Sequence, residues 1–141
     1  MTTILLSIVL SIIFLLLSLI HLNWAMGNKW GFKEAIPTKE NGDRVFNPKN
    51  FDSIIVGLIL ITLACFYLLQ VNAIGYKPPK WSHFFLWIIP SLFLLRAIGD
   101  FKYVGFFKSI KTTLFAKWDS KLFSPLCLSI SIIGFLIVFL N

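Results

Sequence analysis

Two ionisable residues inside a strongly apolar stretch are the clearest candidates for chemistry in this sequence. Arg96 and Asp100 follow an apolar run that begins at Phe84. A helix rises about 1.5 Å per residue through a hydrocarbon core about 30 Å thick, so Arg96 would lie roughly 18 Å and Asp100 roughly 24 Å from Phe84. An unpaired charge near the middle of a bilayer costs on the order of 2.5–3.5 kcal/mol. Both side chains are therefore predicted to face protein and to have partners.

The spacing of Arg96 and Asp100 supports two interpretations. Residues four apart on a helix can pair, although an acid that precedes the base is the better order. In the first interpretation the pair is structural: it specifies the fold, and its remaining polar atoms are hydrogen-bonded by Ser, Asn or backbone groups. In the second, the pair lines a pocket open to one leaflet, where Arg96 or a lysine holds an anionic headgroup and His21 or Asp100 handles a proton.

Other polar residues are predicted to gather at the same depth. The first and third apolar segments end on the same side of the membrane, so the polar residues at their ends can meet beneath the loops. The candidate ligand-binding residues are His21, Trp24, Arg96, Asp100 and Tyr103, with Asn23, Glu34, Asp119 and Ser124 as a second tier.

Metal, cofactor and nucleophile chemistry find little support. His83 is expected at the opposite interface from His21, and Cys65 and Cys127 at different depths, so no metal ligand set has sensible spacing. No phosphate loop, dinucleotide fingerprint or nucleophile elbow is present, and no cofactor is predicted. Ser18 precedes His21 by one turn, but no third group completes a triad.

Composition places the chain in a membrane. Of its 141 residues, 57% are hydrophobic and 13% charged, too apolar for a soluble domain. The net charge of +7 comes from Lys and Arg residues that lie beside long apolar segments. Topology control and anionic headgroups explain these residues better than nucleic acid, which we do not expect as a partner.

Four apolar segments predict an all-α membrane protein, an antiparallel four-transmembrane-helix bundle forming one domain over residues 1–141. The spans are expected at about 4–22, 51–71, 84–100 and 124–140. Small residues form stripes that let helices approach closely. The stripes contain Ser7, Ser11 and Ser18 in the first span, Ser53, Gly57 and Ala64 in the second, and Ser124, Cys127, Ser131 and Gly134 in the last.

Aromatic residues and lysines alternate between the third and fourth spans. Tyr103, Phe107 and Trp118 recur at helical spacing, which predicts an interfacial amphipathic segment over 101–118 with its lysines toward headgroups. A continuation of the third span past Tyr103 is the alternative. The last span is expected to begin at Ser124 and Pro125, because serine is a good N-cap and proline suits the first turn of a helix.

Basic residues predict the orientation of the chain. The first and third loops each hold five Lys or Arg residues and the second holds two. By the positive-inside rule, loops one and three are expected in the cytoplasm and both termini outside.

Three segments resemble hallmark stretches of a small bacterial membrane-protein family catalogued as a domain of unknown function, family 3995. They are His21–Gly31, Leu95–Lys108 and Ser124–Cys127, and the similarity extends over nearly the whole chain. The resemblance implies four spans and a bacterial inner membrane, and no activity. Phe123 stands where the family would have a tyrosine, which leaves a role for a hydroxyl there unsupported.

The leading hypothesis is a non-catalytic membrane protein that binds a lipid, a small amphiphile or a partner in a polar pocket at the cytoplasmic leaflet. One alternative is an intramembrane enzyme that uses His21 and Asp100 for acid–base chemistry on a lipid-like substrate. Another is a structural or immunity-type membrane partner that uses its outward faces.

Overall fold

Apolar helices dominate the computed structural model, which describes residues 1–71 and 76–140. The elements are α1 (Thr2–Ala25), α2 (Phe32–Ala35), α3 (Asn50–Leu69), α4 (Ser82–Ile98), α5 (Leu114–Trp118), the π-helical turn η2 (Asp119–Phe123) and α6 (Ser124–Leu140). The last three form one continuous helix of 27 residues. This helix, α1 and α3 are long and apolar enough to cross a membrane, whereas α4 is a shorter apolar helix. No β-strand occurs in the described ranges.

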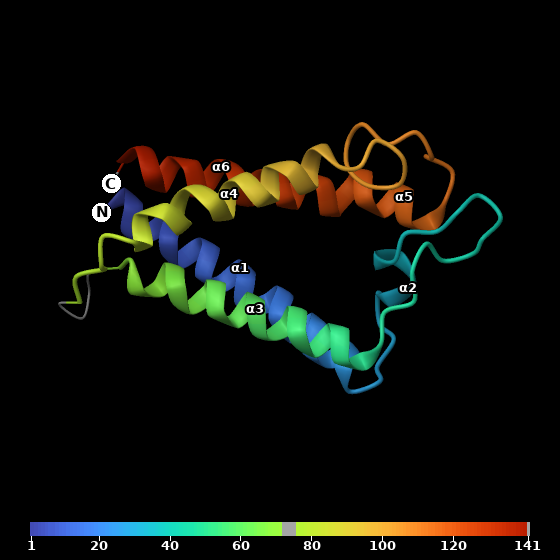
Figure 1. Cartoon of the computed structure of the whole chain (residues 1–141), viewed down its shortest axis with the longest axis horizontal. Coiled ribbons are helices and arrows are strands. Elements are labelled where there is room, and N and C mark those ends of the chain that lie inside the picture. The colour runs from blue at the N-terminus through green and yellow to red at the C-terminus, as the bar shows by residue number, and fades with distance from the viewer. Residues whose placement is uncertain (72–75, 141) are drawn as a thin grey trace.

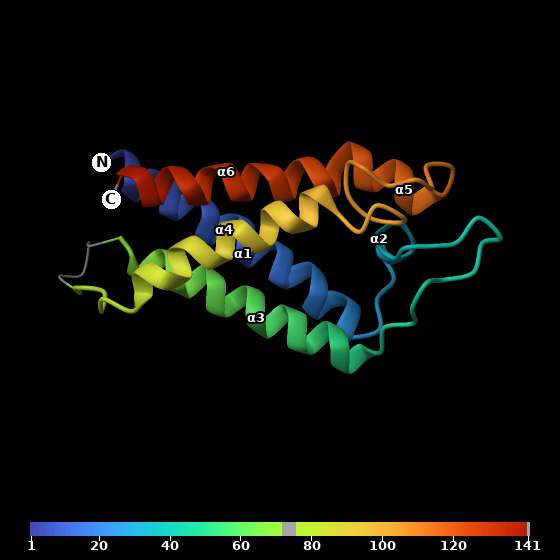
Figure 2. The same cartoon turned by 45° about the horizontal axis from the view of Figure 1, so that its top comes forward.

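The helices form two antiparallel pairs. α1 packs along α3, α4 packs along α6, and contacts between α1 and α6 join the pairs. Both views show the pairs close together near the termini and diverging toward α2 and α5 (Figures 1 and 2). The N- and C-termini therefore lie at one end, with loops one and three at the other.

Small residues explain the close approach of α1 and α3. Ser18 Oγ donates a hydrogen bond to the carbonyl oxygen of Gly57 at 2.8 Å, and Ser11 Oγ to that of Ala64 at 2.8 Å. A Cβ atom at Gly57 would lie 2.9 Å from Leu22 Cδ2. The predicted stripes are therefore confirmed in this pair, where hydroxyl-to-backbone bonds hold the helices together without charge.

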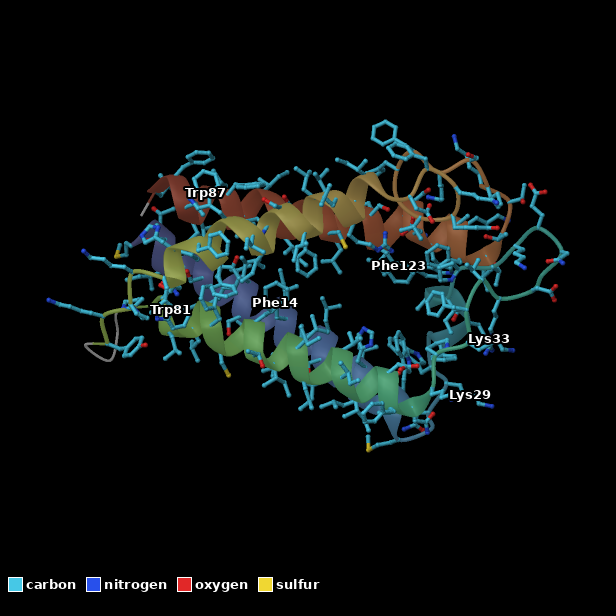
Figure 3. The ribbon with its side chains drawn as sticks, viewed as in Figure 1. Phe14, Lys29, Lys33, Trp81, Trp87 and Phe123 are labelled. Carbon is cyan, nitrogen blue, oxygen red and sulfur yellow. The ribbon has the colours of Figure 1, made fainter. Side chains whose placement is uncertain are left out.

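The core lies where the two pairs meet. Phe14 is fully buried and packs against Tyr67 and Phe93, with ring centroids 5.8 Å and 5.3 Å away. Figure 3 shows Phe14 pointing into the middle of the bundle, while Lys29 and Lys33 mark the loop-one end and Trp81 the opposite end. Many Leu, Ile and Phe side chains elsewhere are exposed, as expected for surfaces that face acyl chains.

Two expected helix boundaries differ in the structure. α4 ends at Ile98 because Gly99, with φ of 89°, turns the chain out of the helix. The last helix does not begin at Ser124 but at Leu114, where the Thr113 hydroxyl accepts a hydrogen bond from the Ala116 N–H at 3.1 Å. The wider η2 turn ends two residues before Pro125, whose ring has no N–H and crowds the preceding turn of a regular helix.

The helical conformation that the aromatic spacing predicts for the segment over 101–118 is wrong for most of its length. Residues 101–113 are irregular, and only Leu114–Trp118 is helical. Local turn chemistry overrides the aromatic periodicity, because Gly99 and Gly105 both adopt positive φ and Asp100 captures the backbone N–H groups that a helix would need.

Candidate functional site

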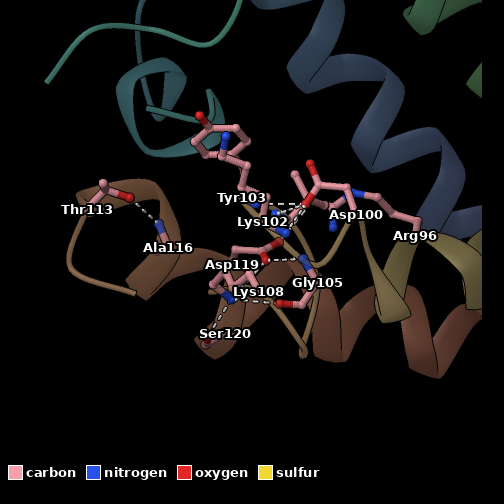
Figure 4. Close-up of polar contacts among 11 residues, drawn as sticks. Arg96, Asp100, Lys102, Tyr103, Gly105, Lys108, Thr113, Ala116, Asp119 and Ser120 are labelled. Carbon is pink, nitrogen blue, oxygen red and sulfur yellow. Dashed lines mark hydrogen bonds and ion pairs between the residues drawn. The ribbon is translucent and has the colours of Figure 1, made fainter. Parts of the chain in front are cut away.

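Asp119 is the centre of a buried polar cluster at the end of the α4–α6 pair (Figure 4). Its side chain is 0% exposed, and its Oδ1 accepts a hydrogen bond from Arg96 Nη2 at 2.9 Å. Its Oδ2 accepts from the Gly105 N–H at 2.8 Å and from Lys108 Nζ at 3.1 Å. One carboxylate thus faces two cations, and the cluster carries a net positive charge.

Lys108 is fully integrated into this cluster. The residue is 2% exposed, and besides Asp119 its Nζ donates to the Gly105 carbonyl at 2.9 Å and the Ser120 hydroxyl at 2.7 Å. An ammonium group has three donors, and all three are used. Asp119 therefore compensates the Lys108 charge in an environment that could not otherwise tolerate it.

Arg96 is bonded much less completely. Only Nη2 meets Asp119, whereas Nη1 is covered and has no hydrogen-bond partner among the described residues. The Arg96 side chain nevertheless keeps 35% of its surface exposed. Ser124, 0% exposed in the first turn of α6, likewise has a hydroxyl without a partner in the described chain. Buried polar atoms without partners cost about 1–3 kcal/mol each, so these two atoms mark places where a ligand's polar group would be stabilised.

Asp100 organises the loop that brings Gly105 and Lys108 to Asp119. Its Oδ1 accepts the backbone N–H groups of Lys102, Tyr103 and Val104 at 2.9, 2.7 and 2.9 Å. Partial burial opposes ionisation, but the hydrogen bonds, with that of Val104 the strongest, outweigh it and lower the pKa of Asp100. Asp100 is thus a turn-capping carboxylate.

Two glycines close the same loop. A Cβ atom at Gly99 would lie 1.7 Å from the Val104 carbonyl oxygen, and one at Gly105 would lie 2.2 Å from the Ile98 carbonyl oxygen. Both residues also have positive φ, at 89° and 90°. Only glycine fits such an approach of backbone to backbone, and it is this approach that aims the Gly105 N–H at Asp119.

His21 and Trp24 belong to a separate cluster in loop one. The His21 ring meets Trp24 edge to face at 4.9 Å, and Trp24 meets Phe32 at 5.5 Å. Trp24 Nε1 donates to the Trp30 carbonyl at 2.6 Å, and the Arg44 guanidinium lies 5.6 Å from the centre of the Phe32 ring. No hydrogen bond or ion pair in the described chain links this cluster to Asp119.

Two hollows open at the loop end of the molecule. The larger, about 500 Å³, lies between loop one and the start of α5 and is lined by residues that include Lys33, Lys39 and Arg44. The smaller, about 120 Å³, lies beside Trp24 and Phe32. Neither of these two hollows is lined by the Asp119 cluster.

The structure regroups the residues predicted from the sequence. The expected pairing of Arg96 with Asp100 is wrong, because α4 ends between them and Arg96 turns to Asp119. Asp119, placed in the second tier, lies at the centre of the cluster, whereas Ser124 is buried in the first turn of α6 without a hydrogen bond to the cluster among the described residues. Tyr103 is half-buried in the Asp100 turn, Asn23 lies beside the loop-one cluster, and Glu34 lies in α2 without an ion pair in the described ranges.

Lys108, Gly105 and Ser120 were not predicted as site residues. One signal in the sequence pointed to them: Asp119 is the only acidic residue between Phe101 and Phe123, a segment with five lysines. A single acid among five lysines can pair with few of them, and the lysine that pairs with Asp119, Lys108, is buried.

Residues 14–134, which contain the entire Asp119 cluster, match the family described as protein of unknown function (DUF3995). The chain belongs to this family. No curated protein and no solved structure matches it. The resemblance seen in the three sequence segments is therefore confirmed for DUF3995, and function has to be argued from the site.

Proposed function

We propose that this DUF3995 protein is a four-span membrane protein that binds an anionic amphiphile, such as a phospholipid, with the headgroup charge against Arg96. The observation that carries the proposal is the charge balance of the Asp119 cluster, in which one buried carboxylate faces two cations. Lys108 has used all its donors, so the surplus charge is available at Arg96, whose Nη1 lacks an acceptor. A guanidinium is well suited to phosphate and carboxylate oxygens.

The depth of the cluster supports a headgroup as the ligand. Along the continuous helix, Asp119 lies roughly 30 Å from Leu140, at about 1.5 Å per residue. The hydrocarbon core is also about 30 Å thick, so Arg96 and Asp119 would lie near the boundary where headgroups begin when Leu140 lies near the opposite one. The five basic residues in each of loops one and three support a cytoplasmic position for this boundary, by the positive-inside rule, and thus a headgroup of the cytoplasmic leaflet as the ligand.

Native mass spectrometry of the protein released from bacterial membranes in mild detergent tests the proposal. We expect wild-type protein to retain an anionic phospholipid and Arg96→Gln to lose it. Arg96→Gln should still fold, because Lys108 continues to compensate Asp119. The matched control is Lys111→Gln, which removes an exposed cation from the same loop and should leave the bound lipid in place.

Two outcomes would overturn the proposal. The first is equal lipid retention by wild-type protein and Arg96→Gln, which would mean that the surplus charge holds no headgroup. The second is a stoichiometric protein in place of a lipid, which would favour the structural or immunity-type partner.

A further inference from the structure

We infer that the loop after α4 is a rigid lipid anchor. Phe101, Phe106 and Phe107, here called the aromatic tip, would insert at the boundary between headgroups and acyl chains and complete a membrane crossing for which α4 is too short. This goes beyond headgroup binding at Arg96 and does not depend on it. The occupant of the tip is the lipid of the surrounding leaflet.

The length of α4 is the first support. Its 17 residues span about 25 Å, less than the hydrocarbon core of about 30 Å. Its neighbour, the continuous helix Leu114–Leu140, spans about 40 Å. Before α4 begins, Trp81 is 65% exposed and suited to the opposite interface. After Ile98 no helical residue remains to cover the missing length, and the aromatic tip follows directly.

The exposure of the tip is the second support. Phe101, Phe107 and Phe106 are 62%, 65% and 41% exposed, and the Phe101 and Phe107 rings lie 6.5 Å apart. Three neighbouring phenylalanines exposed to water would be costly, whereas the interface accepts aromatic rings. Lys102 is exposed beside them, with its Nζ 5.2 Å from the centre of the Tyr103 ring, so a cation accompanies the rings at headgroup level.

The backbone of Phe101 is the third support. Phe101 has φ of 63°, the only positive φ at a non-glycine residue in the described chain. Such a conformation is strained for a phenylalanine and persists only where the surroundings impose it. Here Ser109 imposes it, because its Oγ and its N–H both donate to the Phe101 carbonyl, at 2.6 Å and 3.1 Å. Glycine would adopt this conformation without strain, so a strained phenylalanine with an exposed ring indicates that the ring itself is used.

The depth of the tip is tied to the Asp119 cluster. Gly105, between Phe101 and Phe106, donates its N–H to Asp119, and the Phe106 N–H donates to the Ala97 carbonyl at 2.9 Å. The loop that carries the tip is therefore hydrogen-bonded both to α4 and to the long helix.

Spin-label accessibility in nanodiscs containing phosphatidylglycerol tests this inference. Single cysteines would be labelled at Phe101→Cys and Phe107→Cys in a protein with Cys65 and Cys127 replaced by serine. Phe46→Cys, at a 52% exposed aromatic in loop one, is the matched control. We expect the tip labels to collide more with oxygen than with a water-soluble nickel chelate, and the Phe46 label to show the reverse. Tip labels that behave like the Phe46 label would overturn the inference.

A second comparison separates lipid contact from folding. Phe101→Gly removes the ring and relieves the backbone strain. Phe101→Ala also removes the ring but leaves the backbone strain in place. In detergent, Phe101→Gly should melt no lower than Phe101→Ala. In phosphatidylglycerol nanodiscs, both variants should lose more melting temperature relative to wild-type protein than they lose in detergent. Equal losses in detergent and in nanodiscs would refute a role for the Phe101 ring. Arg96→Gln should leave the accessibility of the Phe107 label unchanged, so the two proposals can fail separately.

Discussion

Neutralising Asp119 should destabilise the protein strongly, although the substitution changes the side chain very little. Asp119→Asn keeps the size of the side chain and one acceptor oxygen but removes the charge that balances Lys108, whose side chain is 1% exposed. Breaking a buried pair by removing one partner costs about 3–5 kcal/mol. Arg96 is 35% exposed and can be solvated, so it adds little. We therefore expect a loss of about 3 kcal/mol in the free energy of unfolding, measured by SDS titration of protein in mixed micelles.

A control variant, Asp43→Asn, and a second cluster variant, Lys108→Met, test the cause of this loss. Asp43→Asn alters an exposed carboxylate in loop one and should change stability by less than about 0.5 kcal/mol. Lys108→Met should cost less than Asp119→Asn, because Asp119 then still pairs with Arg96. The double variant should recover part of the Asp119→Asn loss, with a coupling above about 1 kcal/mol. Strictly additive losses, or an Asp119→Asn cost equal to that of Asp43→Asn, would refute the idea that buried charge balance holds this end together.

Three further predictions follow from the loops. Gly99→Ala, whose Cβ would overlap the Val104 carbonyl, should destabilise the protein by more than about 3 kcal/mol in the same titration, whereas Gly27→Ala, with φ of 91° and open space around it, should cost only about 1 kcal/mol. Because the folded-state pKa of Asp100 is lowered, its stabilisation is present above the ordinary value of about 3.9 and is lost as the pH falls below it. Wild-type protein should therefore lose melting temperature relative to Asp100→Asn below about pH 4, and a constant difference would contradict this. In a cysteine-free background, Asn41→Cys should resist a membrane-impermeant maleimide in intact cells while Lys77→Cys reacts, and the opposite pattern would reverse the topology.

Helix packing was predictable from the sequence because its causes are periodic. Ser18 and Gly57 stand on stripes of small residues, and the structure joins them by a hydrogen bond. Hydropathy also located the apolar segments, with differences of two or three residues at most of their ends and a larger one at the start of the last helix, which begins at Leu114. Both signals repeat along the chain, so no single residue decides them.

The site was only partly predictable because it depends on a loop. Arg96 was recognised from its depth, but its partner depended on where α4 ends, and Gly99 decides that through a backbone conformation that periodicity does not reveal. Asp100 accepts hydrogen bonds from three backbone N–H groups of the loop and does not pair with Arg96. Burial of Lys108 likewise follows from the shape of a non-helical loop, for which lysine–aromatic alternation gave the wrong period.

The pairing of helices has a consequence for how the protein is made. Each pair is a hairpin of two helices that follow one another along the chain: α1 with α3, and α4 with the long helix Leu114–Leu140. Every side-chain hydrogen bond between helices in the described ranges lies within one of these two hairpins. Arg96 is synthesised before Asp119. Because Arg96 lies near the end of α4, its side chain can reach the headgroup region until Asp119 has been inserted. Each hairpin can thus complete its polar bonds while it is inserted, without waiting for the other. We therefore expect the final step of biogenesis to be the docking of the two hairpins through apolar surfaces such as the Phe14–Phe93 contact.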